Sequence, residues 1–175
     1  MQKEYLETER LLLRKFSLDD AEAMFSNWAN DEEVTKYLTW TPHKCIDTVR
    51  MIINDWLIDY EDEKTVRYGI VIKDTNELIG GIDVVEYNDG IPEIGYCMGK
   101  RFWGNGYMPE ACKALIDYLF SLGFPMITIS ADSRNTRSLR VIEKLGFKFD
   151  HEEKQPCSNV KPEIITLKCF KLVRN

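Results

Sequence analysis

The sequence predicts an α/β domain built on one mixed sheet, with helices placed before most of the strands. Three observations support this class. Apolar residues recur at helical spacing early in the chain, and residues 66–99 are rich in β-branched residues separated by short turns. Residues 91–131 then show a strand, a long amphipathic helix and a second strand, which form a right-handed crossover between parallel neighbours. The 175 residues contain no linker or repeat, so we expect a single domain over residues 1–175.

The first part of the chain predicts one strand and three helices. The apolar run at residues 11–16 predicts the strand, and Ser17 with Asp20 is a capping-box pattern that opens the first helix. A short helix is expected after Asp31, and Asp47 is expected to cap the third helix. The apolar faces of the first and third helices are Ala21, Met24, Phe25 and Trp28, and Val49, Ile52, Ile53, Trp56, Leu57 and Tyr60, respectively.

An antiparallel meander of three strands is expected next. Residues 66–73 and 77–87 are joined by the turn sequence Asp-Thr-Asn, and an Asn-Asp-Gly turn leads into the third strand at residues 91–98. Side chains in that strand alternate between two faces, one carrying Ile94, Tyr96 and Met98 and the other Glu93, Gly95 and Cys97.

The last part of the chain predicts two helices and three strands. The first helix ends at Gly123, and a buried strand follows at residues 126–131. The second helix spans residues 135–145 and ends at Gly146 in a left-handed cap, with Phe147 packing on Ile142. Strands at about 147–153 and 163–172 complete the sheet. The buried stripe of the first helix is Met108, Cys112, Leu115, Leu119 and Leu122.

Composition disfavours several classes of function. The net charge of −6 argues against nucleic acid as a partner, because phosphate binding needs a concentrated basic surface. No apolar run approaches the roughly 18 residues of a membrane span, and we expect no signal peptide. Five cysteines without a Cys-x-x-Cys spacing indicate reduced thiols in the cytoplasm. With only His43 and His151, a histidine-rich zinc site is disfavoured, and we expect no metal.

The segment at residues 99–107, "GKRFWGNGY", is typical of an anion-binding loop before a helix. Gly104 and Gly106 lack Cβ atoms, so backbone N–H groups can approach a phosphate at the helix N-terminus. A Walker loop is excluded because Asn105 and Gly106 stand where Lys and Ser or Thr are required. A dinucleotide fingerprint is excluded because Pro109 replaces its third glycine and the loop follows a meander. An Arg-x-x-Gly-x-Gly pattern remains, with Pro109 tolerated in the first turn and a pyrophosphate as the expected anion.

Two stretches at this spacing resemble a known family. "EIGYCMGKRFWGNGYMPEA", followed by "NTRSLRVIEKLGF", is similar to the GNAT acyl-CoA N-acetyltransferases, especially the branch named for enzymes that acetylate the N-termini of ribosomal proteins. The likeness runs from "ERLLLR" to the last strand. It implies the GNAT fold with splayed central strands, acetyl-CoA as the cofactor, and direct attack by a primary amine in a ternary complex.

The resemblance also implies which residues hold acetyl-CoA. Backbone groups of Cys97 and Met98 would pair with the pantetheine arm as a neighbouring strand does. Asn135 would place its amide on the pantetheine, with helix capping as its alternative role. The residues implied around the pyrophosphate are Arg101, Phe102, Trp103, Gly104, Asn105, Gly106 and Tyr107.

Acetyl transfer needs a base for the amine, and three carboxylates are candidates. Glu93 is the first, acting through water at the position where lysine-acetylating relatives carry a carboxylate; partial burial would have to raise its pKa. The alternative for Glu93 is an exposed strand glutamate. Glu163 matches an acidic position common in the branch and is the second candidate, and Asp83 is the third.

The reaction also needs an oxyanion donor and an acid for the leaving thiolate. The family's usual oxyanion donor is the backbone N–H at the position of Cys97, whose thiol we interpret as a small core filler. Many relatives use a tyrosine seven residues after the asparagine as the acid, and here that position is Ile142. Ser138 lies on the same helix face as Asn135 and is the candidate acid, with a helix-surface serine as the alternative.

The amine itself stays open at this point. The branch suggests a protein N-terminal amine, and a polyamine, an amino sugar or an antibiotic is the alternative. A regulatory protein that binds coenzyme A without turnover is the rival class. The acceptor side is expected from residues 19–62 and 151–163, and the chain is expected to act as a monomer or a homodimer.

Overall fold

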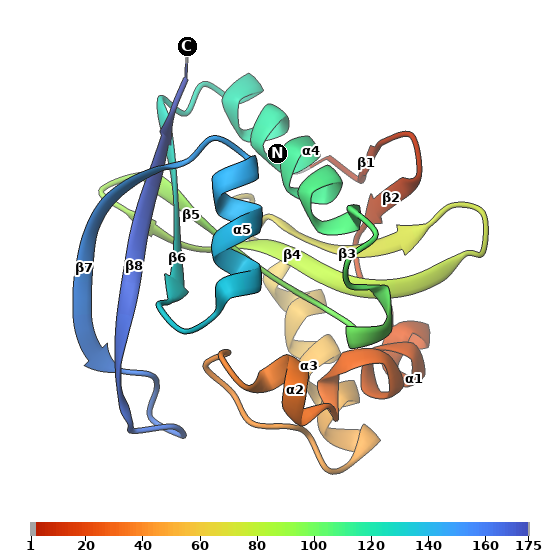
Figure 1. Ribbon diagram of the computed structural model, residues 1–175. Helices are drawn as coiled ribbons and strands as arrows, with labels where there is room; N and C mark the ends of the chain where they lie inside the picture. Colours follow the sequence, from red (N-terminus) through yellow and green to blue (C-terminus); the bar gives the residue numbers. More distant parts are fainter. Residues whose placement is uncertain (1–2, 175) are drawn as a thin grey trace.

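A computed structural model describes residues 3–174, and its strands form one eight-stranded mixed sheet (Figure 1). The strand order is β1-β2-β3-β4-β5-β6-β8-β7, and within the described chain β5 and β6 are the one parallel pair of neighbours. The strands are β1 (Tyr5–Glu7), β2 (Leu11–Arg14), β3 (Arg67–Ile72), β4 (Glu77–Asn88), β5 (Ile91–Met98), β6 (Met126–Asp132), β7 (Lys148–Pro156) and β8 (Ile164–Val173).

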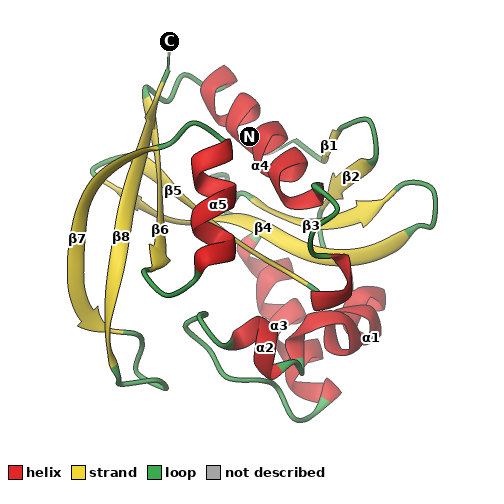
Figure 2. Ribbon diagram, viewed as in Figure 1, coloured by secondary structure: helices red, strands yellow, loops and turns green. Residues whose placement is uncertain are grey.

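Helices cover both faces of the sheet (Figure 2). The long helix α4 and the shorter α5 pack on one face over a core that includes Leu115, Leu119 and Ile94. The early helices α1, α2 and α3 gather on the other face around Trp28 and Ile53. The helices are α1 (Ala21–Met24), α2 (Glu32–Thr35), α3 (Ile46–Asp59), α4 (Tyr107–Ser121) and α5 (Thr136–Lys144). Within residues 3–174, no helix has both the length and the apolar character needed to cross a membrane.

The predicted mixed sheet, meander and crossover are confirmed, with some differences in detail. Strand β1 was not predicted, because its three residues bury only Leu6. The first helix is irregular: a 3-10 turn and α1 are followed by a π-helical turn at Phe25–Ala29. The predicted cap at Asp47 is wrong, since α3 begins at Ile46 and Asp47 instead pairs with Arg50 at 2.8 Å.

Two predicted core positions are also wrong. Leu57 and Leu122 are exposed. Leu122 is the C-cap that follows the last helical residue, Ser121, so it lies beyond the buried stripe of α4. The predicted left-handed cap at Gly146 is confirmed, with a φ of 83° and Phe147 donating to the carbonyl of Ile142.

Strands β5 and β6 separate soon after they meet. A single residue pair, Glu93 with Thr128, joins them. In contrast, β4 and β5 stay paired from Gly80 and Met98 to Asn88 and Ile91. Because the two strands run parallel, the chain beyond Glu93 diverges from β6 and leaves a V-shaped gap at residues 94–98. The predicted splay of the central strands is therefore confirmed.

A buried ion pair fixes the entry to the early helices. Both guanidinium nitrogens of Arg14 lie 2.8 Å from the Asp20 carboxylate, which is 6% exposed and also accepts from the Ser17 N–H at 2.8 Å. We expect Asp20→Ala to lower the free energy of unfolding by about 2 kcal/mol, because it leaves the partly buried Arg14 charge without its carboxylate partner. This expected loss of stability is smaller than the loss on breaking a fully buried ion pair, because the Arg14 side chain is 32% exposed.

Urea denaturation measures this effect, with Asp19→Ala as the matched control. Asp19 lies in the same turn and is exposed, so its loss should change the free energy of unfolding by less than about 0.5 kcal/mol. Equal losses in the two variants would show that the turn, and not the ion pair, carries the stability.

Candidate active site

A cavity of about 690 Å³ opens where β5 and β6 diverge. Strands β4, β5 and β6 form its floor, and residues from the early helices and from α5 form its walls. The predicted site residues that line it are Asp83, Glu93, Cys97, Asn135 and Ser138. Aromatic side chains of the predicted acceptor side also line it, namely Trp28, Tyr37, Trp40 and Trp56, and Phe16 lies beside them.

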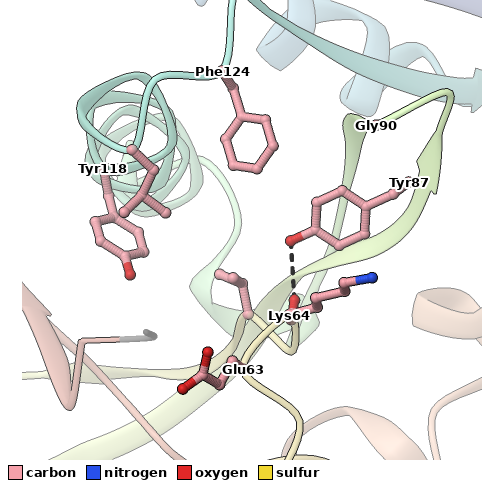
Figure 3. Close-up of a pocket in the computed structure, with 8 residues that line it drawn as sticks. Glu63, Lys64, Tyr87, Gly90, Tyr118 and Phe124 are labelled. Carbon is pink, nitrogen blue, oxygen red and sulfur yellow. Dashed lines mark hydrogen bonds between the residues drawn. The ribbon is translucent and has the colours of Figure 1, made fainter.

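A second cavity, of about 560 Å³, lies elsewhere (Figure 3). It is bordered by Tyr118 on α4, by Phe124 after that helix and by Tyr87 on β4, whose hydroxyl donates to the Lys64 carbonyl at 2.9 Å. None of the sequence-predicted site residues lines it. The chemistry that the sequence predicts therefore concentrates in the cavity between β5 and β6.

The loop between β5 and α4 requires its two central glycines. Gly104 and Gly106 have φ values of 79° and 77°, in the left-handed region where a side chain is strained. The Asn105 amide lies between them and donates to the carbonyls of Phe102 and Trp103 at 3.0 and 3.3 Å. The loop is thus held by its own hydrogen bonds, with the first turn of α4 directly behind it. Such a turn has N–H groups without intrahelical partners, which suits an anion.

Arg10 fastens this loop to the start of the sheet, and sequence reasoning missed it. Its guanidinium donates to the Asn105 carbonyl at 3.0 Å and to Glu110 at 2.7 Å, and it lies 4.6 Å from the centre of the Tyr107 ring. Glu110 also accepts from the Thr8 hydroxyl at 2.6 Å. Burial alone would raise the pKa of Glu110, but the hydrogen bonds from Thr8 and Arg10 lower it below its usual value.

Three side chains near the loop have roles that the sequence did not predict. Phe102 is 8% exposed and belongs to the core, so only its backbone is available to a cofactor. The Arg101 guanidinium is paired with Glu77 and stacks on the Phe102 ring. Arg137 on α5 instead lies 3.4 Å above the Trp103 ring, which brings an exposed cation next to the loop. The sequence signal that could have identified Arg137 is its position two residues after Asn135, at the start of the same helix.

The ladder between β4 and β5 decides which backbone groups face the gap. The Gly99 N–H donates to the Ile79 carbonyl at 2.9 Å. Hydrogen-bonded pairs alternate along an antiparallel ladder, so Cys97, two residues earlier, directs its N–H and carbonyl toward β4. The same alternation directs the backbone groups of Tyr96 and Met98 toward β6. The geometry thus favours Tyr96 and Met98 over the expected Cys97 as backbone donors in the gap.

The Cys97 side chain stands on the face of the sheet that carries the early helices and packs against their core. Burial raises the pKa of the Cys97 thiol to about 12, so the thiol is protonated at neutral pH. A protonated thiol is a poor nucleophile. This agrees with its interpretation as a small core filler and with a reaction that needs no covalent intermediate.

Glu93 has the environment that a general base requires. The side chain is half-buried in the cavity wall, and burial raises its pKa above the usual value. A hydrogen bond from the Ser130 hydroxyl opposes this rise, and the neighbouring carboxylates of Glu86 and Glu153 reinforce it. The Asn88 amide also donates to Glu93 at 3.4 Å. A raised pKa matches the base to the amine that it must deprotonate.

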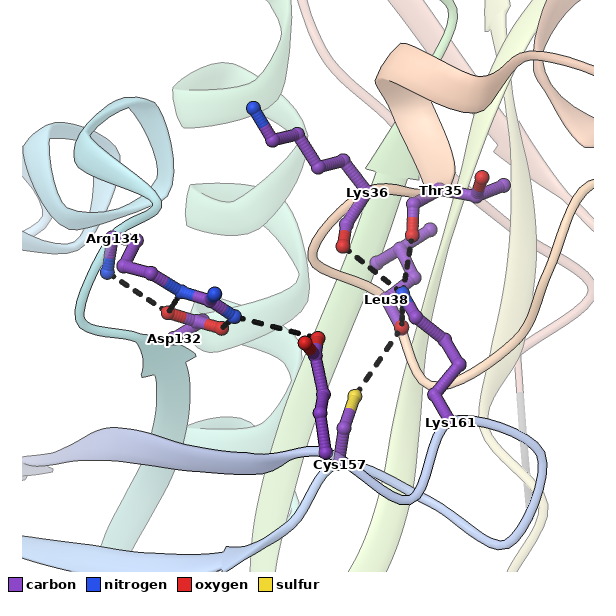
Figure 4. Close-up of polar contacts among 8 residues, drawn as sticks. Thr35, Lys36, Leu38, Asp132, Arg134, Cys157 and Lys161 are labelled. Carbon is purple, nitrogen blue, oxygen red and sulfur yellow. Dashed lines mark hydrogen bonds and ion pairs between the residues drawn. The ribbon is translucent and has the colours of Figure 1, made fainter.

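The other two carboxylates are each held by an arginine. Asp83 lines the cavity and burial raises its pKa, but the Arg67 guanidinium at 3.3 Å opposes the rise. Glu163 is 52% exposed and lies 3.5 Å from Arg134, which also binds Asp132 at 2.6 Å (Figure 4). Glu163 does not line the cavity. The geometry therefore favours Glu93 among the three candidates.

Ser138 and Tyr96 meet across the cavity. The Tyr96 hydroxyl on β5 lies 2.8 Å from the Ser138 hydroxyl on α5, and burial raises the pKa of Tyr96. Asn135 caps α5 by accepting from the Ser138 N–H at 3.2 Å, which matches its alternative role. Ile142 is fully buried in the core. Sequence reasoning placed Tyr96 on a strand face but missed this pair, because the two residues are 42 positions apart.

A lysine joins two segments that lie beside the cavity (Figure 4). The Lys161 ammonium donates to the carbonyls of Thr35, Lys36 and Leu38 at 3.1, 3.0 and 2.8 Å. The Cys157 thiol donates to the same Leu38 carbonyl at 3.6 Å. These contacts tie the loop between β7 and β8 to the segment that follows α2. Both segments were expected on the acceptor side.

The splayed parallel strands, the glycine loop at the start of α4 and the cavity between them define an acyl-transfer enzyme. Residues 10–148 match the family described as the acetyltransferase (GNAT) domain. The chain therefore belongs to the GNAT family and is an acetyltransferase.

Individual relatives agree with this family. An uncharacterized N-acetyltransferase, p20, from Bacillus licheniformis is 38% identical over 150 residues, covering 82% of each chain. The fold is similar to that of RimL, a ribosomal L7/L12 alpha-N-protein acetyltransferase in complex with coenzyme A, with a TM-score of 0.85, 18% identity and coverage of 97% and 98%. It is also similar to the microcin C7 self-immunity acetyltransferase MccE in complex with acetyl-CoA and AMP, with a TM-score of 0.83, 20% identity and coverage of 95% and 94%.

Proposed function

We propose that the enzyme transfers the acetyl group of acetyl-CoA to a primary amine by direct attack in a ternary complex. The divergence of β5 and β6 beyond the Glu93–Thr128 pair carries this proposal, because it leaves backbone groups of a central strand free beside a cavity. A pantetheine arm has amides that can pair with such groups. The coenzyme A complexes of proteins with this fold support the same choice of cofactor.

The cofactor would extend from the cavity to the loop before α4. The Tyr96 carbonyl and the Met98 N–H would pair with the pantetheine amides in the gap, while the Met98 carbonyl accepts from the Trp103 indole at 2.9 Å. The N–H groups from Gly104 to Tyr107 would bind the pyrophosphate, because both glycines let the backbone approach it. Arg137, which stacks on Trp103 beside this loop, is a suitable cation for a phosphate oxygen.

The transfer would then use three groups around the thioester. Glu93 accepts the proton of the amine through a water molecule, so the neutral amine can attack the thioester carbonyl. The Tyr96 N–H, on the cavity-lining part of β5, donates to the oxyanion as the carbon becomes tetrahedral. When the carbon–sulfur bond breaks, the Ser138 hydroxyl donates a hydrogen bond to the departing thiolate, and Tyr96 orients that hydroxyl. The thiolate takes up the proton that the attacking nitrogen loses as the amide forms.

The Ser138–Tyr96 pair predicts a specific pattern of rate losses. Ser138→Ala should lower kcat roughly 10- to 100-fold, because a hydrogen bond to a charged group contributes about 1.5–3 kcal/mol. Tyr96→Phe should lower kcat about tenfold, since it removes only the group that orients Ser138. The double variant should be no slower than Ser138→Ala, because residues that act as a unit are not additive. Fully additive losses in steady-state kinetics would refute the pairing.

The acceptor that we propose is a protein N-terminal amine. An α-amine has a pKa of about 7.7–8.0, well below the 10.4 of a lysine side chain, so a carboxylate base such as Glu93 deprotonates it more readily. Residues of the segment 37–43 line the cavity together with Gln155 and Cys157 at the end of β7, and a peptide chain could leave the site between these two segments. The similarity to a ribosomal-protein N-terminal acetyltransferase supports the same choice.

A panel of amines tests the proposal, with thiol release as the readout and mass spectrometry to locate the acetyl group. The panel holds peptides with free N-terminal Ser, Ala or Met, an Nα-blocked peptide with one lysine, a polyamine, an amino sugar and an aminoglycoside. Acetylation of the free N-termini at the highest kcat/KM is the expected result. A higher kcat/KM on any small amine would overturn the acceptor class, and binding of coenzyme A without thiol release from any of them would overturn catalysis.

A further inference from the structure

Three metal-ligating side chains meet on the β7–β8 hairpin, outside the groups used for acetyl transfer. They are His151 and Glu153 on β7 and Cys169 on β8. One nitrogen, one oxygen and one sulfur from these side chains all lie within 4.8 Å of one another. Two of the residues are exposed and Cys169 is partly buried, so a small ion can reach all three.

A β-bulge brings the three residues together. The register runs from Phe149 opposite Phe170 directly to His151 opposite Cys169, so Asp150 is the additional residue. Residues that face each other in an antiparallel pair place their side chains on the same side of the sheet. Glu153 is two residues further along β7 and returns to that side. Without the extra residue at 150, His151 would pair with a different residue of β8.

The imidazole of His151 lies between two carboxylates. Its Nδ1 is 2.8 Å from Asp150 and its Nε2 is 2.8 Å from Glu153. A neutral imidazole carries one N–H, which satisfies one of these carboxylates and leaves a nitrogen lone pair facing the oxygen of the other. Two lone pairs at this separation need a positive charge between or beside them. That charge is either a second proton or a metal ion.

We propose that His151 Nε2, Glu153 and Cys169 bind a divalent transition metal of the zinc class. Imidazole, thiolate and carboxylate together are typical ligands of Zn²⁺, and a water molecule would complete the tetrahedron. Asp150 would accept a hydrogen bond from Nδ1 and hold Nε2 toward the ion, as carboxylates commonly do behind metal-binding histidines. Hard cations such as Mg²⁺ are disfavoured because they prefer oxygen ligands alone.

The surrounding charges favour a cation at this place. The carboxylates of Asp150 and Glu153 both lie at the His151 ring, and the Cys169 sulfur accepts a hydrogen bond from the Ser130 hydroxyl at 3.6 Å. The negative charge of the two carboxylates attracts a metal ion. The nearby cation Lys171 is engaged by Asp150 at 2.6 Å on the carboxylate oxygen that His151 does not use. Metal binding would displace the thiol proton, which goes to solvent.

The ion would fasten an edge strand. Strand β7 is exposed along its whole length and pairs with β8 alone among the described strands. Because the ligands come from both strands, the bound ion would hold β7 and β8 together at the bulge. Binding to the folded state alone stabilises a protein by mass action, so occupancy should raise the melting temperature. The acetyl transfer proposed above does not use the ion.

Cobalt titration of untagged, reduced and chelator-treated protein tests the site, because Co²⁺ takes the same ligands and is coloured. One equivalent should produce a thiolate-to-cobalt charge-transfer band in the near-ultraviolet, and Zn²⁺ should remove it. Cys169→Ser should abolish the band, and His151→Gln should weaken cobalt binding by at least about tenfold. Cys157→Ser and His43→Gln are matched controls on a different face and should leave the titration unchanged.

Zinc and the melting temperature give a second readout. Zn²⁺ should raise the melting temperature of the unaltered protein and of Cys157→Ser, but not of Glu153→Gln or Cys169→Ser. Far-ultraviolet circular dichroism checks that the variants fold. A charge-transfer band that is missing in the unaltered protein, or that survives Cys169→Ser, would overturn the proposal. Because neither readout measures acetyl transfer, a failure here is distinguishable from a failure of the proposed function.

Discussion

Replacement of Gly104 by alanine should raise the Kd for acetyl-CoA at least about tenfold while the protein still folds. A Cβ atom at this position meets no protein atom within 4 Å, so it causes no clash inside the chain. The φ of 79° strains the new side chain by about 1–2 kcal/mol. The added methyl group would also stand between the backbone N–H groups and the pyrophosphate. One lost hydrogen bond to a charged group accounts for about tenfold in affinity.

Gly123→Ala separates the two contributions. Gly123 has a φ of 94° and a Cβ there also meets nothing within 4 Å, but it lies beyond the opposite end of α4. Both variants should lose a similar amount of stability in thermal melts. Only Gly104→Ala should lose acetyl-CoA affinity in isothermal titration calorimetry. Equal affinities in the two variants would show that the loop does not hold the cofactor through its backbone.

Replacement of Glu93 by glutamine should lower kcat/KM by about 100-fold or more near neutral pH, because a general base contributes about that much. The amide keeps the size and one hydrogen-bond acceptor of the carboxylate but cannot take a proton. In the unaltered enzyme, kcat/KM should fall as the pH drops through the raised pKa of Glu93. This fall in kcat/KM at low pH, the acidic limb of the pH profile, should be absent from the residual activity of Glu93→Gln. A loss below about threefold would exclude Glu93 as the base.

Glu86→Gln is the matched control for Glu93. Glu86 is exposed on β4 opposite Glu93, and its charge helps to raise the pKa of Glu93. Removing that charge should lower the pKa of Glu93, so the acidic limb of kcat/KM should move to lower pH while the plateau rate changes little. A limb that stays in place would show that another group controls the profile.

Much of the fold could be predicted because the signals are local. Hydrophobic spacing predicts α3 and α4, turn residues predict the meander, and the order of elements predicts the parallel pair. The glycines at 104 and 106 were predicted as a close-approach loop, and both adopt the left-handed conformation that glycine favours. Boundaries were less predictable, as at Asp47, because several polar residues near a helix start can cap it and tertiary packing selects among them.

The candidate site was predictable only in part. Glu93, Asn135 and Ser138 line the cavity as the motifs indicated. The pairing of Tyr96 with Ser138, the cation that Arg137 brings to Trp103 and the burial of Phe102 depend on contacts between distant elements. The exposure of Glu163 beside Arg134 depends in the same way on how the last hairpin folds back. None of these contacts has a signature in neighbouring sequence positions.

The sequence by itself determined the order of the elements, the family and the loop that can receive a pyrophosphate. Short-range sterics account for this, since glycine conformation, helix periodicity and strand alternation involve residues within a few positions of one another. Only the tertiary structure decided which backbone amides face the gap and which carboxylate is half-buried without an arginine beside it. Those properties depend on strand register and on packing across the sheet, where a shift of one residue reverses every direction.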